Sequence, residues 1–315
     1  MADNKRIDTP TGTETVGHEW DGIEELNTPL PRWWLWSFYI TIVWAIAYTI
    51  VYPAWPMLAS YTQGTFGWTS RGQLDEALKQ QAAERAPIVN AIEKTEIADL
   101  PNNPQLMSAA IEGGRAAFKV YCVQCHGSSA TGSKGYPNLL DDDWLWGGDI
   151  GAIHTTLVNG IRYPGNDLTR NSAMPAFGRD GILQPAEIRA LVGHVQSISH
   201  QGPANAQGAA LFAANCAVCH GPEGKGNREL GAPNLTDGIW LYGGDAAALT
   251  ETITNARAGV MPAWGHQLSP ATIKMLAAYV HSLGGGEATP APVPTADAAV
   301  AAAAPATDAG NSVQP

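Results

Sequence analysis

Two short runs of residues have the types and spacing for redox chemistry. They are Cys-x-x-Cys-His runs, formed by Cys122, Cys125 and His126 and by Cys216, Cys219 and His220. In such a run both thiols can add to the vinyl groups of a haem, and the adjacent histidine can ligate the iron from one face. The two runs contain all four cysteines of the chain. The sequence therefore predicts two covalently bound haem c groups.

Other uses of a Cys-x-x-Cys pair leave signals that are not visible around these runs. A thioredoxin-like redox motif requires a βαβ setting, and a zinc site requires further cysteine or histidine partners. The sequence shows neither, which favours haem attachment.

The chain repeats itself from about Leu106 onward. In each copy a glycine and an aromatic residue lie eight and four positions before the first cysteine, which places them on one face of a helix. The matching elements, first copy and then second, are Gly114 with Gly208, Phe118 with Phe212, 137–139 with 233–235, 144–149 with 240–245, and 174–178 with 261–265. We interpret this pattern as a tandem duplication.

A methionine followed by proline lies downstream of each haem run, at Met174 and Met261. A thioether sulfur suits haem iron and, opposite histidine, raises the reduction potential relative to two histidines. The proline biases the methionine toward an extended backbone, which helps to hold the loop against a haem. We expect Met174 to be the sixth ligand in the first copy and Met261 in the second. The alternative is that each methionine merely fills a gap in the packing.

Other methionines and histidines are weaker candidates for the sixth position. Met107 precedes its cysteine run, and Met275 lies among core positions of a helix. His194 matches Tyr279 of the second copy, so we expect it near the core. The remaining candidates have no partner in the other copy and are expected at the surface: His154, His200, His266 and His281.

An amphipathic helix closes each copy. Pro185 and Pro270 fit the first position of a helix, the latter after Ser269 as an N-cap. Apolar residues then recur with three-four spacing. We therefore expect a mainly α protein with two tandem class I cytochrome c-like domains, at residues 106–200 and 201–284, behind one transmembrane helix.

The transmembrane helix is expected at residues 33–52, which contain no charged side chain. Twenty residues of helix match the roughly 30 Å hydrocarbon core of a bilayer, and Trp or Tyr residues at both ends suit its interfaces. A buried core helix is one alternative. A cleaved signal peptide is another, but the stretch begins late and lacks a small-residue cleavage site.

The remaining segments follow from this anchor. Arg32 adjoins the amino-terminal end, whereas the next basic residue beyond the helix is Arg71, which favours a cytoplasmic segment 1–32. Because c-type haem is attached outside a bacterial inner membrane, we expect the haem domains and the connector 53–105 to be periplasmic. Within the connector, a helix of residues 73–90 should end or kink near Pro87.

The sequence also gives expectations for the carboxyl-terminal tail and for a few charged or aromatic side chains of the haem domains. The Ala/Pro/Thr-rich tail, 285–315, is expected to be disordered. Arg162 and Arg257 either pair with haem propionates or are exposed. The acidic run 141–143 either steers a basic electron donor or is a solvated loop. Trp144 and Trp240 are expected to pack near the haem edge.

Irons ligated on both faces leave no open position for substrate, so we expect electron transfer and not bond chemistry. Residues 18–284 resemble the dihaem subunit III of cbb3-type cytochrome c oxidases. The resemblance depends on residues 21–27, 29–34 and 52–56, one membrane helix and two haem domains.

The resemblance implies that His126, His220, Met174 and Met261 are axial ligands. It also implies electron transfer from the cytochrome bc1 complex or a cytochrome c to the monohaem subunit II and the catalytic subunit I. The chain has no copper-binding histidine cluster, so oxygen reduction would belong to its partners. No nucleic-acid partner is expected.

Three other functions remain open from the sequence. The chain could be the dihaem electron acceptor of another membrane dehydrogenase. It could be a dihaem peroxidase, which requires one displaceable ligand. A haem-based sensor is a third alternative, although no signalling domain is visible.

Overall fold

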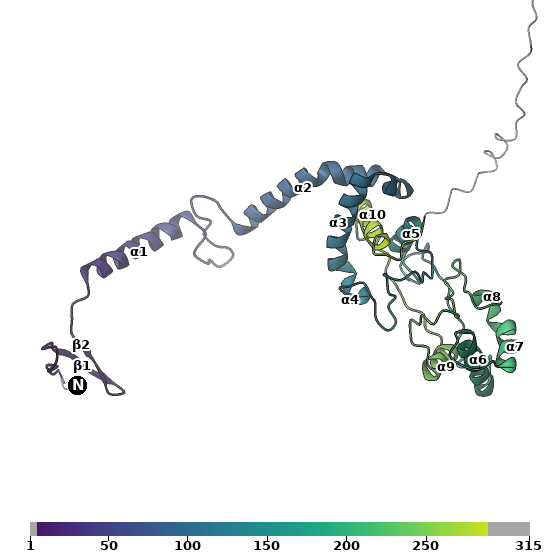
Figure 1. Cartoon of the computed structure of the whole chain (residues 1–315). Coiled ribbons are helices and arrows are strands. Elements are labelled where there is room, and N and C mark those ends of the chain that lie inside the picture. The colour runs from purple at the N-terminus through teal and green to yellow at the C-terminus, as the bar shows by residue number, and fades with distance from the viewer. Residues whose placement is uncertain (1–4, 289–315) are drawn as a thin grey trace, which may run out of the picture. The chain divides into compact units, whose positions relative to one another are not determined.

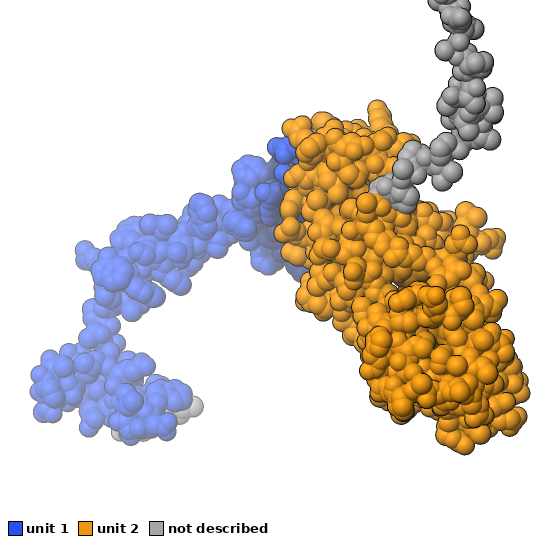
Figure 2. Space-filling model, turned by 45° about the vertical axis from the view of Figure 1, so that its right-hand side comes forward, with its two compact units in different colours: residues 1–84 blue, residues 85–315 orange. Residues whose placement is uncertain are grey.

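A computed structural model describes residues 5–288 of the chain, and within them it is mainly helical, as expected. It divides into two compact units, residues 1–84 and 85–315 (Figure 2). In chain order (Figure 1) its elements are β1 (Thr15–Trp20), β2 (Ile23–Leu26), α1 (Arg32–Val51), α2 (Ser70–Lys94), the 3-10 helix η1 (Ile97–Asn102), α3 (Pro104–Tyr121), α4 (Val123–His126), α5 (Ile150–Asn159), α6 (Pro185–Ile198), α7 (Ala206–Asn215), α8 (Ala217–His220), α9 (Ala246–Asn255) and α10 (Pro270–His281).

The amino-terminal segment contains a β-hairpin that the sequence analysis did not predict. Strands β1 and β2 pair antiparallel, with Trp20 opposite Ile23. The turn between them is Asp21-Gly22, and both residues have positive φ angles, 49° and 84°. An Asp-Gly pair suits a two-residue hairpin turn, because both central residues must enter the left-handed region. This dipeptide was the signal that could have revealed the hairpin.

Helix α1 covers the expected membrane span, shifted by one residue to Arg32–Val51. It is long and apolar enough to cross a bilayer, the one such helix among the described residues. The hydroxyl groups of Ser37, Thr41 and Thr49 donate to main-chain carbonyls three or four residues earlier, at 2.7–2.9 Å. These bonds satisfy the polar atoms within the helix itself, as a hydrocarbon environment requires.

Of the two expected outcomes at Pro87, an end or a kink, helix α2 does not show the end, because it continues to Lys94. Its last turns and η1 belong to a folded core, in which Ile92 and Leu100 are completely buried. The ammonium group of Lys274 on α10 donates to the carbonyls of Glu93 and Thr95. The end of the connector is therefore held by tertiary packing, which overrides the local effect of a proline.

Two lobes follow, each with its own hydrophobic core. Lobe A consists of residues 104–160 and 261–288, and contains α3, α4, α5 and α10. Lobe B consists of residues 174–255, and contains α6, α7, α8 and α9. Figure 1 shows these two groups of helices as separate clusters. Lobe B is thus one continuous segment inserted into lobe A.

The helix contacts cross the boundary between the expected domains 106–200 and 201–284. The closing helix of the first copy, α6, packs on α7 of the second copy, and the closing helix of the second copy, α10, packs on α3 of the first. Each lobe therefore combines parts of both sequence copies. Such an exchange of equivalent elements is the intrachain counterpart of domain swapping.

The two helix pairs use the same contact, built on the glycine and the aromatic residue noted in each copy. A side chain at Gly114 would collide with the backbone of Met275 on α10, and one at Gly208 would collide with that of Ala190 on α6. The Phe118 and Tyr279 rings are 5.4 Å apart. The absence of a Cβ at each glycine allows the helices to approach closely.

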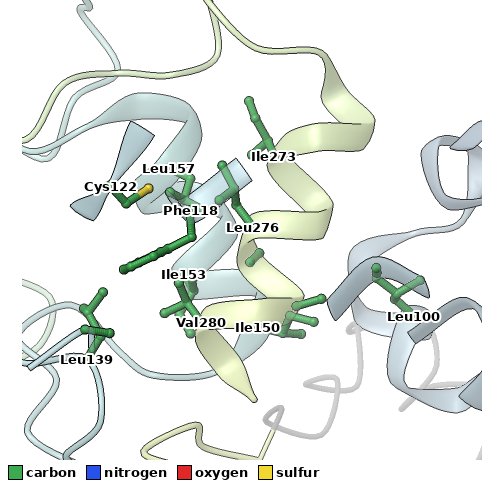
Figure 3. Packing of buried hydrophobic residues seen from close by; sticks show 14 of the residues in the cluster. Leu100, Phe118, Cys122, Leu139, Ile150, Ile153, Leu157, Ile273, Leu276 and Val280 are labelled. Atoms are coloured by element: carbon green, nitrogen blue, oxygen red, sulfur yellow. The ribbon is translucent and has the colours of Figure 1, made fainter. Parts of the chain in front are cut away.

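In lobe B the equivalent ring pair is His194 with Phe212, 5.2 Å apart. The match of His194 with Tyr279 is therefore confirmed. Figure 3 shows the core of lobe A, where Ile273, Leu276 and Val280 of α10 lie among side chains of α3 and α5. Burying a leucine or isoleucine fully contributes about 1.5–3 kcal/mol, so this face of α10 is sufficient to hold a helix that is distant in sequence.

Helix caps repeat between the lobes as well. The carboxylates of Asp149 and Asp245 accept from the first free N–H groups of α5 and α9, at 3.0 Å. Ser269 caps α10 by accepting from the N–H of Thr272, as predicted. These side chains satisfy the N–H groups that a helix start leaves without partners.

Two crossover segments, 161–173 and 256–260, connect the lobes. Ile161 and Met261 exchange two main-chain hydrogen bonds of 3.0 Å, so the second segment returns to lobe A beside the start of the first. Next to them, Trp146 of lobe A packs on Gly231 of lobe B, and Tyr242 of lobe B packs on Gly135 of lobe A. These reciprocal contacts join the lobes.

Residues 285–288 also belong to lobe A, although they were expected to start the disordered tail. The indole N–H of Trp144 donates to the carbonyl of Gly285 at 2.6 Å, and Glu287 donates its N–H to the carbonyl of Gly148 at 2.9 Å. Arg228 of lobe B forms an ion pair with the Glu287 carboxylate. The rest of the expected tail, 289–315, lies outside the described residues.

Candidate haem sites

The cysteines of each run lie at the junction of two helices. Cys122 ends α3 and Cys216 ends α7, and the one-turn helices α4 and α8 follow directly. A spacing of three residues on one helical turn places Cys122 and Cys125 on the same side. None of the four cysteines forms a disulfide. The backbone therefore holds each pair as covalent haem attachment requires.

The two imidazole rings have the same orientation. His126 donates from Nδ1 to the carbonyl oxygen of Pro137 at 3.1 Å, and His220 donates from Nδ1 to that of Pro233 at 3.0 Å. A carbonyl can only accept, so Nδ1 carries the proton and Nε2 is left to bind a metal. The repeated Pro-Asn-Leu stretch thus supplies the group that orients each histidine.

Burial lowers the pKa of both imidazoles, and the bonds to the proline carbonyls oppose this effect in part. Desolvation disfavours the charged form of histidine. A neutral imidazole is the form that ligates iron, so the environment of both rings favours ligation.

A cavity in lobe B brings the residues of one site together. Cys216, Cys219 and His220 line it, and so does Met174. Its other walls are largely apolar, with Leu191, Val195, Phe212, Leu235, Leu249 and Ile253 among them. A thioether and an imidazole in one apolar cavity with two thiols provide the donor set of a His/Met-ligated haem c.

The main chain fixes the loop that carries Met174. Phe177 and Gly178 donate to the carbonyls of Ile253 and Thr254 at the end of α9, at 3.1 and 3.2 Å. In lobe A the equivalent bonds run from Trp264 to Leu157 and from Gly265 to Val158, at the end of α5, at 2.9 and 3.2 Å. The two methionine loops are therefore held in the same way.

Met261 belongs to lobe A, where it packs against the core that contains Cys122 and Phe118. The expectation paired each methionine with the haem run of its own copy. The structure places them the other way, with Met174 beside the second run and Met261 beside the first. The reason is the exchange of segments, since each methionine loop accompanies its closing helix into the other lobe.

In the first copy, the residue equivalent to Arg257 is Arg170, not the Arg162 considered in the sequence analysis. Arg170, like Arg257, lies four residues before its methionine. The guanidinium of Arg170 lies over the Trp146 ring at 5.3 Å, and that of Arg257 lies over the Tyr242 ring at 5.0 Å. Trp146 and Tyr242 occupy the same position in the repeat, so Arg170 is the counterpart that the sequence analysis missed. Spacing from the methionine was the available signal.

Arg162 has a different environment, between the crossover segments. Its φ angle is +50°. Its Nε donates to the carbonyl of Gly259 at 2.7 Å and its Nη1 to that of Ser172 at 2.8 Å. Burial lowers the pKa of Arg162, with a small opposing effect of Tyr242. Arg162 is therefore half-buried, so the alternative of a fully exposed arginine is wrong.

The repeated Trp-Leu-x-Gly-Gly-Asp stretch is a structural unit. The Trp144 indole packs on Gly148, and the Trp240 indole packs on Gly244, where any side chain would collide with the ring. Trp144 packs against the lobe A core and Trp240 lines the cavity described above. Both tryptophans therefore lie beside the candidate sites.

The surface histidines divide into two groups. His200 and His266 are exposed, as expected, whereas His154 and His281 are half-buried. His281 lies 2.8 Å from the carbonyl of Glu287, through Nε2. None of these rings lines the lobe B cavity.

The acidic run 141–143 is only partly a solvated loop. Asp142 is exposed, but Asp143 is half-buried. Burial, together with the carboxylates of Asp237, Asp141 and Asp142, raises the pKa of Asp143 to about 6, against the opposing effect of Arg228. Asp143 therefore lies near an acidic residue of lobe B, Asp237.

Comparison with known proteins gives consistent matches along the chain. Residues 12–59 match the family described as the N-terminal domain of cytochrome oxidase-cbb3, FixP. Residues 109–195 and 203–280 match the family described as cytochrome C oxidase, cbb3-type, subunit III.

Individual relatives agree over nearly the whole chain. The cbb3-type cytochrome c oxidase subunit FixP of Bradyrhizobium sp. (strain ORS 278) is 54% identical over 291 residues, which cover 91% of this chain and 100% of that protein. Subunit CcoP of Cereibacter sphaeroides is 52% identical, over 88% of this chain and 97% of that protein. Subunit FixP of Azorhizobium caulinodans is 52% identical, over 89% and 96%.

Proposed function

We propose that this chain, which belongs to the subunit III family of cbb3-type cytochrome c oxidases, carries electrons toward the oxidase. It is a membrane-anchored cytochrome c subunit of the respiratory chain. In our proposal it holds two haem c groups, one in each lobe, outside the membrane. The single observation that carries the proposal is the cavity that joins Cys216, His220 and Met174.

The residues assigned to each haem come from both copies of the repeat. In lobe A, Cys122 and Cys125 attach the haem, and His126 and Met261 are its axial ligands. In lobe B, Cys216 and Cys219 attach the haem, and His220 and Met174 are its axial ligands. The positions of the methionines in the two cores support this pairing.

When bound, each haem supplies an iron that accepts and releases one electron. The chain would supply each haem with two ligands held on fixed backbone, which leaves no coordination position for a substrate. His126 and His220 would bind the iron through Nε2, because each Nδ1–H donates to a proline carbonyl. The subunit thus transfers electrons without bond chemistry.

The alternatives from the sequence lose support here. Membership of the oxidase family disfavours the acceptor subunit of another dehydrogenase and a sensor. A dihaem peroxidase needs a displaceable ligand, whereas main-chain bonds to α5 and α9 hold both methionine loops.

The partners and the orientation are also part of the proposal. With α1 in the membrane and residues 1–32 in the cytoplasm, both lobes lie in the periplasm of a bacterial cell. A cytochrome c or the bc1 complex donates electrons, and the monohaem subunit II and catalytic subunit I receive them. Haem c attachment outside the inner membrane and the position of Arg32 support this orientation.

The crossed pairing is tested with chains that carry a single haem. The C216A/C219A chain retains only the lobe A haem, and the C122A/C125A chain retains only that of lobe B. M174H and M261H are introduced into each, and the reduction potential is measured by spectroelectrochemistry. Replacing Met by His should lower the potential by a substantial part of the roughly 0.8 V that axial ligands span.

The pairing predicts which potential changes. M261H should lower the potential of the C216A/C219A chain and M174H should not, and the reverse should hold in the C122A/C125A chain. Each methionine substitution is thus the control for the other. If each methionine instead affected the haem of its own sequence copy, the crossed assignment would be wrong.

A further inference from the structure

The segment that follows the membrane helix contains no charged side chain. It consists of residues 53–69, between α1 and α2 (Figure 1), and the first charged residue after Arg32 is Arg71, at the start of α2. Segments that lie in water usually carry charged side chains. The uncharged part of the chain therefore extends well beyond the span of α1 and ends where the polar helix α2 begins.

Large apolar side chains of this segment are exposed. Leu58 is fully exposed, and Phe66 is 67% exposed. Four more exposed side chains of this kind belong to the same segment: Trp55, Met57, Tyr61 and Trp68. Such a concentration of exposed apolar side chains marks an interaction surface.

The segment folds back onto the end of α1. The main-chain N–H groups of Thr65 and Phe66 donate to the carbonyls of Ile50 and Val51, at 3.1 and 3.2 Å. A Cβ at Gly64 would collide with the Val51 carbonyl, and its φ angle of +73° suits glycine. The loop is therefore fixed to the last turn of the membrane helix, and it lies at the same membrane face as that turn.

Aromatic rings join the loop to the helix as well. The Tyr52 ring meets the Phe66 ring at 5.6 Å and the Trp68 ring at 5.8 Å, both edge to face. On its other side it stacks on Tyr48 of α1 at 4.7 Å. Tyrosine and tryptophan rings are enriched where the hydrocarbon core of a membrane meets water. This cluster therefore matches the boundary at which α1 ends.

The main chain at the start of the loop is prepared to leave water. Each N–H group of residues 53–57 is paired within the loop, and two of these residues are prolines, which have none. The hydroxyl oxygen of Thr62 accepts from Ala54 at 3.4 Å and from Trp55 at 3.0 Å, and Met57 donates to a main-chain carbonyl of the loop at 2.7 Å. Paired groups reduce the cost of transfer to a less polar environment.

We propose that residues 53–69 form an interfacial loop that lies in the lipid bilayer, with Trp55 and Leu58 at the boundary between headgroups and acyl chains. The loop is continuous with the lipid-facing helix α1, and neither carries charge, so the lipid around the helix is the expected occupant. The headgroup region adds about 5–7 Å on each side of the hydrocarbon core, enough for one layer of folded chain. The proposal takes only the leaflet, the periplasmic one, from the proposed function.

The test uses the full-length dihaem chain in lipid nanodiscs of phosphatidylethanolamine and phosphatidylglycerol, in which both membrane faces meet the buffer. The natural cysteines are bound to haem in this chain, so L58C provides the free thiol that takes a spin label. Collisions of the label with oxygen, which concentrates in lipid, are compared with collisions with a water-soluble nickel chelate. A77C is the matched control, because Ala77 is exposed on α2.

The label at position 58 should prefer oxygen over the nickel chelate several-fold more than the label at position 77. The same measurement is made on the chain within the purified oxidase, and the lipid contact should persist there. If L58C does not accumulate, M57C decides in the same way, because Met57 is its exposed neighbour.

The proposal is overturned if the label at position 58 meets the nickel chelate as readily as the label at position 77. It is also overturned if the label is shielded from both probes in the oxidase, because a partner subunit would then cover the loop. Neither result affects electron transfer or the crossed ligation. The proposed function would instead fail through absent haem in the optical spectrum or uncrossed methionine effects in the single-haem chains.

Discussion

Lobe A and lobe B contain the same elements in a different chain order. Lobe B is continuous, and its helices α6 and α7 are joined by residues 199–205. Lobe A is interrupted, and its helices α3 and α10 are separated by all of lobe B. Closing a long loop costs more conformational entropy than closing a short one. The comparison teaches that a repeat in sequence need not coincide with a folding unit.

The lobes also differ in how equivalent positions are satisfied. Tyr279 of lobe A corresponds to His194 of lobe B, and the hydrogen-bonded Trp144 corresponds to the unpaired Trp240. In lobe A the Trp144 indole N–H donates to a carbonyl of the segment 285–288. Lobe B has no equivalent segment within residues 174–255. Equivalent positions of the two lobes therefore differ in their hydrogen-bond partners.

The largest expected effect concerns fragments of the chain. Residues 174–255 contain a complete lobe B, with His220 and Met174, and should bind haem with both axial ligands when exported and matured. Residues 106–200 contain the first haem run without Met261 and α10, and should yield a haem with an open position. Optical spectra and carbon monoxide binding distinguish the two.

The reverse result would contradict this comparison. A carbon monoxide-insensitive, methionine-ligated haem in fragment 106–200, together with a reactive haem in fragment 174–255, would mean that each sequence copy closes on itself. The full-length chain, in which both sites should resist carbon monoxide, is the reference.

The next effect concerns the close helix contacts. G114A should separate α3 from α10, and G208A should separate α7 from α6, because a Cβ would collide with backbone in each case. Overpacking of this kind costs about 1–3 kcal/mol. G114A should also weaken methionine ligation in lobe A. The measurement is carbon monoxide binding to the haem during urea unfolding. Equal weakening in both lobes by either variant would argue against separate cores.

A smaller effect concerns acid stability. Burial lowers the pKa of His194, so the unfolded chain, with a histidine pKa of about 6.5, takes up a proton before the folded one. The stability contribution of His194 is present above that pH and is lost as the pH falls below it. H194Y, which copies Tyr279, should reduce this loss.

The measurement is the free energy of urea unfolding of both chains at neutral and mildly acidic pH. The pKa of His154 in lobe A is also lowered, by burial and by Lys274, with Glu96 opposing. This histidine is present in both chains, so its contribution cancels. An unchanged acid sensitivity in H194Y would exclude His194 as a source.

The smallest effect concerns the acidic contact between the lobes. The pKa of Asp143 is raised from 3.8 to about 6, so the folded chain binds more protons than the unfolded chain between these values. Stability therefore falls as the pH rises through this window and remains lower above it. D143N should stabilise the protein above pH 6 and have little effect below pH 4. The exposed Asp142, as D142N, is the control in thermal unfolding.

Much of the molecule could be predicted from the sequence because its signals are local. The haem runs depend on residues within one turn, the span of α1 on an uninterrupted apolar stretch, and the N-cap at Ser269 on a side chain beside the helix that it starts. The Asp21-Gly22 turn was equally local and could have been found. Pro87 shows the limit, since packing of the following residues continued the helix through it.

The pairing of parts could not be predicted in this way. Both opening helices present a glycine and a phenylalanine, at Gly114 and Phe118 or at Gly208 and Phe212, and both closing helices present the same apolar stripe. Local sequence therefore fits either closing helix to either opening helix. The choice of the partner helix, and with it the positions of Met174 and Met261, depends on where the crossover segments lie.

By itself the sequence determined the chemical groups of this protein: two sets of thiols and imidazole, two thioethers and one apolar span. Only the tertiary structure decided which thioether faces which imidazole, that Arg170 and Arg257 stack on equivalent aromatic rings, and that the Trp144 indole has an acceptor whereas the Trp240 indole has none. The physical reason is that ligand type is a property of single residues. Ligand pairing is instead set by helix packing between segments that are distant in the chain.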